Sequence, residues 1–358
     1  LHPRVRRQRQ MCIRDRYMSF LQCQTKRREL MNKKLITIAV LSGMIFSVRA
    51  QEAETIESQP KGKAIVQIFT DAHSGLGKDN GDKGFNLNRG YLGYEYKLND
   101  ELTMKAVIDV GRSRQVDDYE RIAYAKNAFV TWEHDRITLS GGLISTTQFK
   151  TQESFWGKRY VEKSFQDAYD FGSSADLGVS FAYRFADWIS ADVIMANGEG
   201  YKNIQVGDGF QYGAGVTLKP LNGLTLRFYG SYNEEGTDGG TGIGNFATFL
   251  GYSCKAFNIG AEYNYQANAS HVEGQDQNGY SVYSTVRLGK NINVFGRWDY
   301  LTSKNDWNTE DDCMTGLIGA EFKLGKYIKL APNFRIKNPT ADGAENSYYA
   351  YLNCSFSI

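Results

Sequence analysis

The side chains with the clearest chemical potential are charged residues that alternate with apolar ones along short segments. In residues 102–111, Lys105 and Asp109 alternate with Met104 and Ile108. Comparable alternation predicts one shared polar face that carries Lys105, Arg184, Arg227, Arg287, Arg297, Lys323, Lys329 and Arg335, together with Glu95, Asp109, Asp192, Glu262, Asp299 and Glu321. Opposed charges on facing walls of a water-filled passage set a transverse field that steers ions without covalent chemistry. Taken singly, each is better explained as a solvated wall residue in a cross-strand pair, but the basic excess of the set favours anions.

A second group of charged residues lies in one long connection, residues 146–174. We expect a constriction there, formed by Lys150, Glu153, Lys158, Arg159, Glu162 and Lys163. The same connection holds the aromatic residues Phe155, Trp156, Tyr160, Phe165, Tyr169 and Phe171. A connection that stayed in solvent would have little use for so many aromatic rings, so we expect it to fold inward. The alternative is that these rings cap the end of the fold or contact a neighbouring subunit.

Histidine is the other residue type that could carry chemistry. A hydrolase built on a membrane barrel needs a hydrogen-bonded histidine beside a nucleophile or an activated water. After residue 50 the sequence has His73, His134 and His271. His73 precedes Ser74, but adjacent residues point to opposite faces of a strand. We therefore expect no enzyme, no metal and no cofactor, and a barrel hydrolase remains the least favoured alternative.

The elements that must position these side chains are strands. The 23 Tyr, 20 Phe and 37 Gly, against 5 Pro, suit strands with aromatic girdles and tight turns. A period of two over about ten residues is the length that a tilted strand needs to cross hydrocarbon. We place about 16 such strands near residues 63–73, 85–98, 101–110, 122–133, 136–145, 175–185, 188–197, 210–219, 223–234, 243–254, 257–268, 280–288, 292–302, 313–324, 327–337 and 347–357.

The connections between these segments alternate between long and short. The short ones include Asn99-Asp100 and His134-Asp135, and the long ones include 111–121 and 146–174. Membrane barrels have short turns on the periplasmic side and longer loops outside, with an even number of strands. A soluble sandwich has no reason to sort its loops in this way. The sequence therefore predicts an all-β, transmembrane antiparallel barrel whose last strand pairs with its first, because a sheet in lipid cannot leave an open edge.

The first 62 residues divide into three expected parts. Residues 1–30 are rich in Arg and are expected to be a non-native upstream segment, although an arm that binds nucleic acid is the functional alternative. Residues 31–50 have the basic start, apolar stretch and small residues before a cleavage point that mark a signal peptide. Residues 51–62 would be a short periplasmic segment before the barrel, 63–358.

Export changes the charge of the chain. The formal net charge of the whole sequence is +2, but residues 1–50 hold 12 of the 42 Lys and Arg and 2 of the 40 Asp and Glu. The remaining 30 basic and 38 acidic residues give a net charge of −8. We therefore expect no nucleic-acid partner. Cys254, Cys313 and Cys354 remain, an odd number without metal or redox spacing.

The stretch from Ser140 to Phe171 resembles the phosphate-selective porin O/P family. The features in common are Gly141-Gly142-Leu143-Ile144 at a strand end, Phe149-Lys150, the aromatic and basic run from Phe155 to Tyr160, and Lys163-Ser164-Phe165. The resemblance implies a trimeric, sixteen-stranded porin of the Gram-negative outer membrane whose long third extracellular loop folds inward. It also implies passive diffusion of small hydrophilic solutes or inorganic anions. The acids Glu153 and Glu162 favour a broader specificity than phosphate alone.

Such a protein would have the lipid bilayer, lipopolysaccharide and the barrel assembly machinery as partners, and it would form a homotrimer. Two alternatives use the same barrel differently. An adhesin or structural barrel would bind partners through its acidic outer loops and keep its lumen blocked. A gated nutrient transporter would need 22 strands and a plug domain, for which the stretch between Gln51 and the first expected strand is too short.

Overall fold

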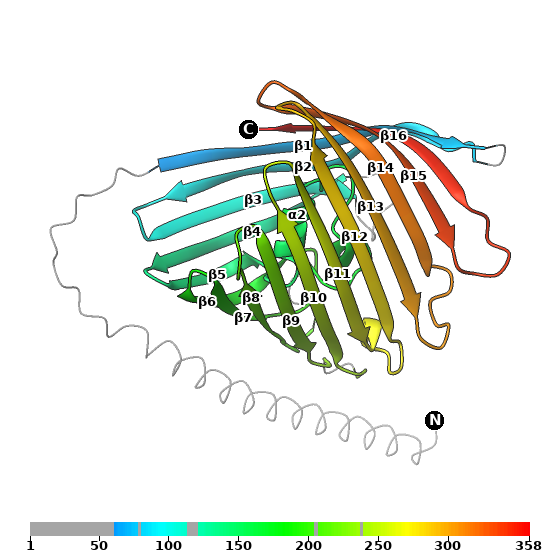
Figure 1. Ribbon diagram of the computed structural model, residues 1–358. Helices are drawn as coiled ribbons and strands as arrows, with labels where there is room; N and C mark the ends of the chain where they lie inside the picture. The colour runs from blue at the N-terminus through cyan, green and yellow to red at the C-terminus, as the bar shows by residue number, and fades with distance from the viewer. Residues whose placement is uncertain (1–60, 78–79, 113–120, 204–206, 237–238) are drawn as a thin grey trace, which may run out of the picture. The chain divides into compact units, whose positions relative to one another are not determined.

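Sixteen antiparallel strands form a closed barrel in the computed structural model, which describes residues 61–77, 80–112, 121–203, 207–236 and 239–358 (Figure 1). Each strand pairs with its neighbours in the sequence, and the last pairs with the first. The strands are β1 (Lys61–Leu76), β2 (Lys83–Lys97), β3 (Leu102–Arg112), β4 (Arg121–His134), β5 (Ile137–Ser145), β6 (Ala175–Ala186), β7 (Ile189–Ala196), β8 (Gln211–Leu218), β9 (Leu224–Asn233), β10 (Ile243–Ser253), β11 (Phe257–Ala267), β12 (Gln277–Arg287), β13 (Ile292–Ser303), β14 (Cys313–Leu324), β15 (Ile328–Pro339) and β16 (Ser347–Ser357).

The pairing of β1 with β16 closes the sheet. Their register runs from Gln67 opposite Ser357 to Leu76 opposite Tyr348. Closure gives the backbone N–H and C=O groups of both terminal strands a partner, and each such group left unpaired in hydrocarbon would cost several kcal/mol. The predicted pairing of the last strand with the first is therefore confirmed.

The exposed face of the sheet is apolar and the enclosed face is polar, which is the reverse of a soluble protein. On β11, Phe257 and Ile259 are 37% and 43% exposed, whereas Glu262 and Asn264 are 6% and 0% exposed. On β16, Leu352 is 45% exposed and its neighbour Asn353 is 1% exposed. Apolar side chains thus cover the outside and polar side chains are enclosed, which is the arrangement expected of a barrel surrounded by lipid.

All of the predicted strands are present, so the expected fold class is confirmed. The bounds differ from the expected ones by a few residues, and β12 begins at Gln277, three residues before the expected start at residue 280. The connection 146–174 contains two short helices that were not predicted, α2 (Lys150–Trp156) and α3 (Phe165–Ala168). A 3-10 turn, η1 (Ala269–His271), lies in the connection after β11.

Strict alternation fails at three β-bulges. Phe69 is opposite Arg89 while Thr70 is opposite Leu87, so Asn88 is an extra residue in β2. A second bulge lies in β4, where Lys126 is the extra residue opposite Val107 and Ile108 of β3. A third lies in β6, between Arg184 and Ala186. A bulge lets two consecutive residues face the same side. A period of two therefore misplaces side chains on one side of each bulge.

The expected segments 1–30 and 31–50, and all of 51–62 except its last two residues, lie outside the described residues. β1 includes Lys61 and Gly62, which were expected to precede the barrel. Among the described residues, no helix combines the length and the hydropathy that would let it cross a membrane.

An outward side chain at the middle of β16 tests whether the exposed face contacts lipid. We expect Leu352→Arg to lower the free energy of unfolding by about 2–4 kcal/mol, because Arg is then placed in hydrocarbon. The matched control is Tyr348→Arg on the same face near the end of β16, where the cost should be at most about 1 kcal/mol. Urea titration of the barrel in phospholipid vesicles measures both. Equal effects at the two positions would contradict an outer face in lipid.

Candidate functional site

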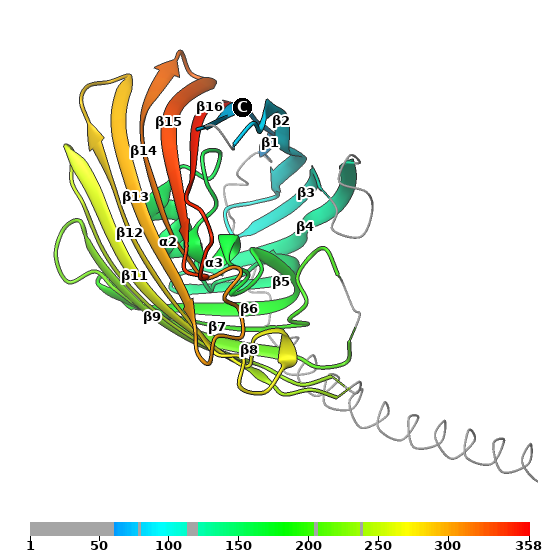
Figure 2. The same cartoon turned by 90° about the vertical axis from the view of Figure 1, so that its right-hand side faces the viewer.

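The connection 146–174 is anchored by aromatic side chains that pack against the strands. Trp156 is 1% exposed, and its ring lies 5.6 Å from that of Tyr283 and 6.1 Å from that of Phe295. Phe165 is 0% exposed and packs over Gly279, where a Cβ atom would lie only 2.1 Å from the Phe165 ring. Both helices are seen within the curve of the strands in Figure 2. The connection thus rests on the β12–β13 part of the wall.

Three strand arginines of the predicted polar face hold this connection through its backbone. Arg227 donates from Nη2 to the carbonyl of Thr147 at 2.6 Å, and Arg335 donates from Nη2 to the carbonyl of Val161 at 2.7 Å. Arg297 donates to the carbonyl of Lys163. These guanidinium groups are therefore committed to holding the chain, which sequence alternation could not show.

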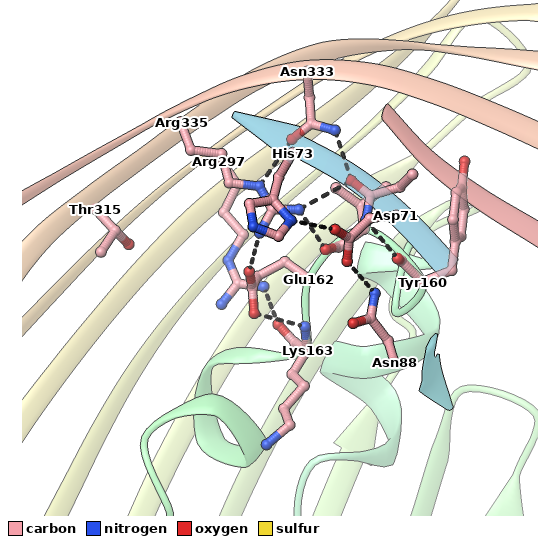
Figure 3. Close-up of polar contacts among 12 residues, drawn as sticks. Asp71, His73, Asn88, Tyr160, Glu162, Lys163, Arg297, Thr315, Asn333 and Arg335 are labelled. Carbon is pink, nitrogen blue, oxygen red and sulfur yellow. Dashed lines mark hydrogen bonds and ion pairs between the residues drawn. The ribbon is translucent and has the colours of Figure 1, made fainter. Parts of the chain in front are cut away.

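The same arginines are also paired with carboxylates. Arg227 Nη1 lies 2.7 Å from Asp192 Oδ2, and Arg297 Nη2 lies 2.6 Å from Asp299 Oδ2. Arg335 Nη1 lies 2.7 Å from Oε2 of Glu162, a residue of the connection itself. Their planar forks allow each to contact a carboxylate and a carbonyl together. Figure 3 shows Arg335 joined to Glu162, beside Arg297 and Lys163.

Two further residues of the connection make side-chain contacts with the wall. Lys158 Nζ donates to Thr285 Oγ1 at 2.8 Å, and the Tyr160 hydroxyl donates to Glu321 Oε2 at 2.8 Å. Glu321 also accepts a hydrogen bond from Asn293 at 2.7 Å. Burial lowers the pKa of the Lys158 ammonium to about 8, although the Glu321 carboxylate favours its charged form. Lys158 and Glu321, predicted in different groups, thus meet at one place.

Three of the remaining expected constriction residues, Glu153, Arg159 and Lys163, lie near one another. Arg159 Nη1 lies 2.9 Å from Glu153 Oε2 and 2.6 Å from Asp167 Oδ2. Burial opposes the charged form of Asp167, but Arg159 and Lys163 outweigh it, so the pKa of Asp167 falls below its usual value. Lys163 Nζ donates to the carbonyl of Asp167 at 3.3 Å. Lys150, the first residue of α2, is exposed.

Other members of the predicted polar face lie toward the end of the barrel with the short connections. Arg184 donates to the carbonyl of Asp135 in the turn after β4, and Arg287 donates to the carbonyl of Cys254 in the turn after β10. Lys105 Nζ lies 3.3 Å from Glu95 Oε2. These basic groups are thus separate from the cluster around Arg159. Glu262 instead lies deep on the polar face of β11, where Asn264 donates to it at 3.3 Å.

Two basic residues of the site, Arg89 and Lys126, were missed. Lys126 is the extra residue of a bulge in β4, whereas Arg89 is on the same face as Glu95 by plain alternation and was left out of the predicted set. Arg89 pairs with Asp109, which is 0% exposed, and donates to the Tyr201 hydroxyl at 2.9 Å. Lys126 Nζ donates to the Tyr91 hydroxyl at 3.2 Å and lies 4.5 Å from the centre of its ring. The signal for both was a pair of consecutive polar residues inside an otherwise alternating strand, Asn88-Arg89 and Lys126-Asn127.

Arg89 and Arg159 line a cavity of about 450 Å³ between the connection and the walls formed by β1, β2, β15 and β16. Asp71, on this wall, accepts hydrogen bonds from His73 Nδ1 at 2.9 Å and Asn88 Nδ2 at 2.6 Å, as Figure 3 shows. The charged side chains of its lining are Arg89, Arg159, Lys163, Lys202, Arg335, Asp71 and Glu162. Basic groups therefore outnumber acidic ones in this cavity.

A second cavity, of about 460 Å³, has the opposite balance. It lies toward the short connections, and its charged lining residues are Lys105, Lys150, Glu95, Glu133 and Asp192. A basic cavity and a slightly acidic one thus lie in different parts of the enclosed space. A charged solute that moved along the barrel would meet fields of different sign.

The histidine considered for hydrolysis makes structural contacts. His73 Nδ1 contacts Asp71, and its Nε2 lies 3.5 Å from Asp82 Oδ1. The Ser74 hydroxyl donates to the carbonyl of Gly75 at 3.1 Å. The side chains of His73 and Ser74 are thus committed to different partners, as the opposite faces of adjacent strand residues predict.

The fold is that of known outer-membrane channels, although no family model and no curated protein matches the chain. Pseudomonas putida OprB matches with a TM-score of 0.63 at 10% identity over 83% of this chain and 94% of its own. The anion-selective porin from Comamonas acidovorans gives 0.61 at 12% identity, over 84% and 100%. The outer membrane channel DcaP of Acinetobacter baumannii gives 0.60 at 12% identity, over 86% and 100%. The likeness establishes the porin fold, and the phosphate-selective family is not confirmed.

The anchoring of the connection 146–174 can be tested without reference to transport. We expect Trp156→Ala to make the folded barrel sensitive to trypsin after Lys158 or Arg159, because removing this buried ring forfeits about 3–5 kcal/mol of packing. The matched control is Trp188→Ala, since Trp188 is 54% exposed. Mass spectrometry of the fragments identifies the cleavage point. A connection that stays uncut in the Trp156 variant, or is cut equally in the control, would contradict this anchoring.

Proposed function

We propose that this chain is an outer-membrane porin that allows passive diffusion of small hydrophilic solutes and favours anions. The single observation that carries the proposal is a closed barrel with an apolar exterior and an enclosed, charged interior. Sixteen strands enclose more space than strand side chains alone can fill. The likeness in fold to outer-membrane channels supports the same function.

The constriction is assigned to the connection 146–174 inside the lumen. Its aromatic rings and backbone carbonyls contact β9, β12, β13 and β15, which supports assigning its bulk to one side of the space. The solute then passes along the opposite wall, β2 to β4, where Arg89 and Lys126 stand beside Arg159. The polar groups that hold the connection are satisfied by one another and do not bind solute.

The preference for anions is assigned to this second wall. Asp71 and Asp109 are 6% and 0% exposed, and their carboxylates accept hydrogen bonds from neighbouring side chains. The cavity beside this wall is lined by five basic side chains, Arg89 and Arg159 among them, against the carboxylates of Asp71 and Glu162, so basic groups outnumber acidic ones where an ion would pass. Basic groups in a narrow, partly dehydrated passage raise the local concentration of anions.

A broad anion preference agrees better with these contacts than a dedicated phosphate site. Arg159 is bridged by Glu153 and Asp167, and Arg89 by Asp109. A carboxylate already occupies part of each guanidinium fork, so fewer donors remain for the several oxygens of a phosphate. The resemblance to phosphate-selective porins would then extend to the architecture and not to the substrate.

Export and assembly complete the proposal. A signal peptide at 31–50 would direct the chain to the periplasm, where the barrel assembly machinery would insert it beside lipopolysaccharide. The expected homotrimer would leave each lumen separate. Phospholipid and lipopolysaccharide would contact the apolar exterior.

The charge of the β2–β4 wall can be tested by reversal potential in planar bilayers under a salt gradient. We expect the wild type to favour chloride over potassium, and Arg89→Gln/Lys126→Gln to lower that preference roughly severalfold, because two basic groups leave the passage. Both substitutions keep hydrogen-bonding capacity. The matched control is Arg287→Gln, which lies in a different part of the barrel wall and should change the ratio little.

Two results would count against the assignment. If the double variant and the wild type gave the same reversal potential, the β2–β4 wall would not set selectivity. If Arg287→Gln changed the ratio as much as the double variant, selectivity would come from net charge and not from this wall.

A further inference from the structure

Hydroxyl side chains form a row across four neighbouring strands, β3 to β6, which lie side by side in Figure 1. Thr103 of β3 is paired with Thr131 of β4. Thr131 is paired in turn with Ser140 of β5, and Ser140 with Ser180 of β6. Because neighbouring strands are about 4.8 Å apart, this hydroxyl row extends over roughly 15 Å of the wall.

The hydroxyl row faces the lumen. Successive side chains of a strand point to opposite faces of the sheet, and the neighbours of the row point outward. Met104, next to Thr103, is 46% exposed, and Val179, next to Ser180, is 52% exposed. All four residues of the row line the cavity of about 460 Å³ that lies toward the short connections.

Much of the hydrogen-bonding capacity of the row is available to a ligand. Thr131 Oγ1 and Ser140 Oγ lie 2.8 Å apart, so one hydroxyl donates to the other and the acceptor keeps its own proton for a further partner. Within the described parts of the chain, the hydroxyls of Thr103 and Ser180 have no hydrogen-bond partner. A hydroxyl both donates and accepts. The row can therefore meet the hydroxyl groups of a solute in either role.

Two of the three carboxylates that line this cavity are neutralised by basic side chains. Glu95 Oε2 lies 3.3 Å from Lys105 Nζ, and Asp192 Oδ2 lies 2.7 Å from Arg227 Nη1. Neither carboxylate therefore adds an uncompensated negative charge beside the hydroxyl row.

The other two charges of the cavity, Glu133 and Lys150, come from opposite ends of the neighbouring strands. Glu133 is paired with Thr138, the next inward pair toward the short turn after β4. Lys150 is the first residue of α2, in the connection that follows the other end of β5. Lys150 is exposed, and among the described residues its ammonium group has no carboxylate partner. A solute on the row thus meets a basic group on the side of the connection.

We propose that the hydroxyl row binds a polyhydroxylated carboxylate, a solute of the sugar-acid class, as it passes through the lumen. The row exchanges hydrogen bonds with the hydroxyl groups of the solute, and Lys150 contacts its carboxylate. The ring of Phe129, which lines the same cavity, gives the C–H face of the solute an apolar surface. This inference rests on the proposed function, since the solute must also pass the basic groups beside the constriction.

The test is titration of the chloride current of single channels in a planar bilayer with three probes. Glucuronate carries hydroxyl groups and a carboxylate, glucose carries hydroxyl groups alone, and hexanoate carries a carboxylate alone. We expect glucuronate to reduce the current of the wild type saturably. Its apparent affinity should be at least about fivefold higher than that of either other probe, because only glucuronate makes both kinds of contact.

Two variants separate the hydroxyl contacts from the carboxylate contact. Thr103→Val/Thr131→Val keeps the branched shape that suits a strand, and it should lower the affinity for glucuronate about tenfold, because hydrogen bonds are lost. Its reversal potential and its response to hexanoate should stay unchanged. Lys150→Gln should lower the affinity for glucuronate to that for glucose. The matched control is Thr225→Val, since Thr225 is 7% exposed on β9 and does not line this cavity.

Four outcomes would overturn the proposal. In the wild type these are equal affinities for glucuronate and hexanoate, or for glucuronate and glucose. In the variants they are an unchanged affinity for glucuronate without the two hydroxyls, or an equal loss in Thr225→Val. All four are read from channels that conduct chloride. A bilayer that stays silent would instead overturn the proposed function, and this inference with it.

Discussion

The hydrogen-bonding requirement of the backbone in hydrocarbon is the constraint on which this structure depends. A sheet in lipid has no water to satisfy an open edge, so β16 must pair with β1. Closure then fixes which side chains face lipid and which are enclosed. The adjacent residues Leu352 and Asn353 illustrate this, since their side chains are on opposite faces of the sheet and are 45% and 1% exposed. The enclosed polar space is a direct consequence of closing the sheet.

Enclosed charges need partners, and this second constraint is the basis of our proposal for where the passage lies. Arg227, Arg297 and Arg335 are satisfied by carboxylates and by carbonyls of the connection 146–174, so that side of the barrel is filled. Removing one partner of such a buried ion pair destabilises the fold by more than the intact pair stabilises it. In the proposed function, the β2–β4 wall, with Arg89 and Lys126, is the side along which a solute moves.

Period-two patterning predicted the strands, their closure and the face of Asp109 or Glu262, because burial on one side of a strand leaves a direct mark on the sequence. It could not predict Lys126, which is the extra residue of a bulge in β4, although alternation from Glu95 does place Arg89 on the polar face. It also could not separate Arg335, which holds the connection, from Arg159, which lies beside Tyr91. That distinction depends on contacts between residues far apart in the sequence, such as Arg335 and Val161.

The most direct test of the account is the single-channel current of the purified barrel in a planar bilayer. An enclosed polar passage that is only partly filled by the connection 146–174 predicts discrete current steps of uniform size that rise linearly with voltage. A bilayer that stays silent, while the same preparation is shown to be folded and inserted, would contradict an open lumen and favour a structural or adhesive barrel.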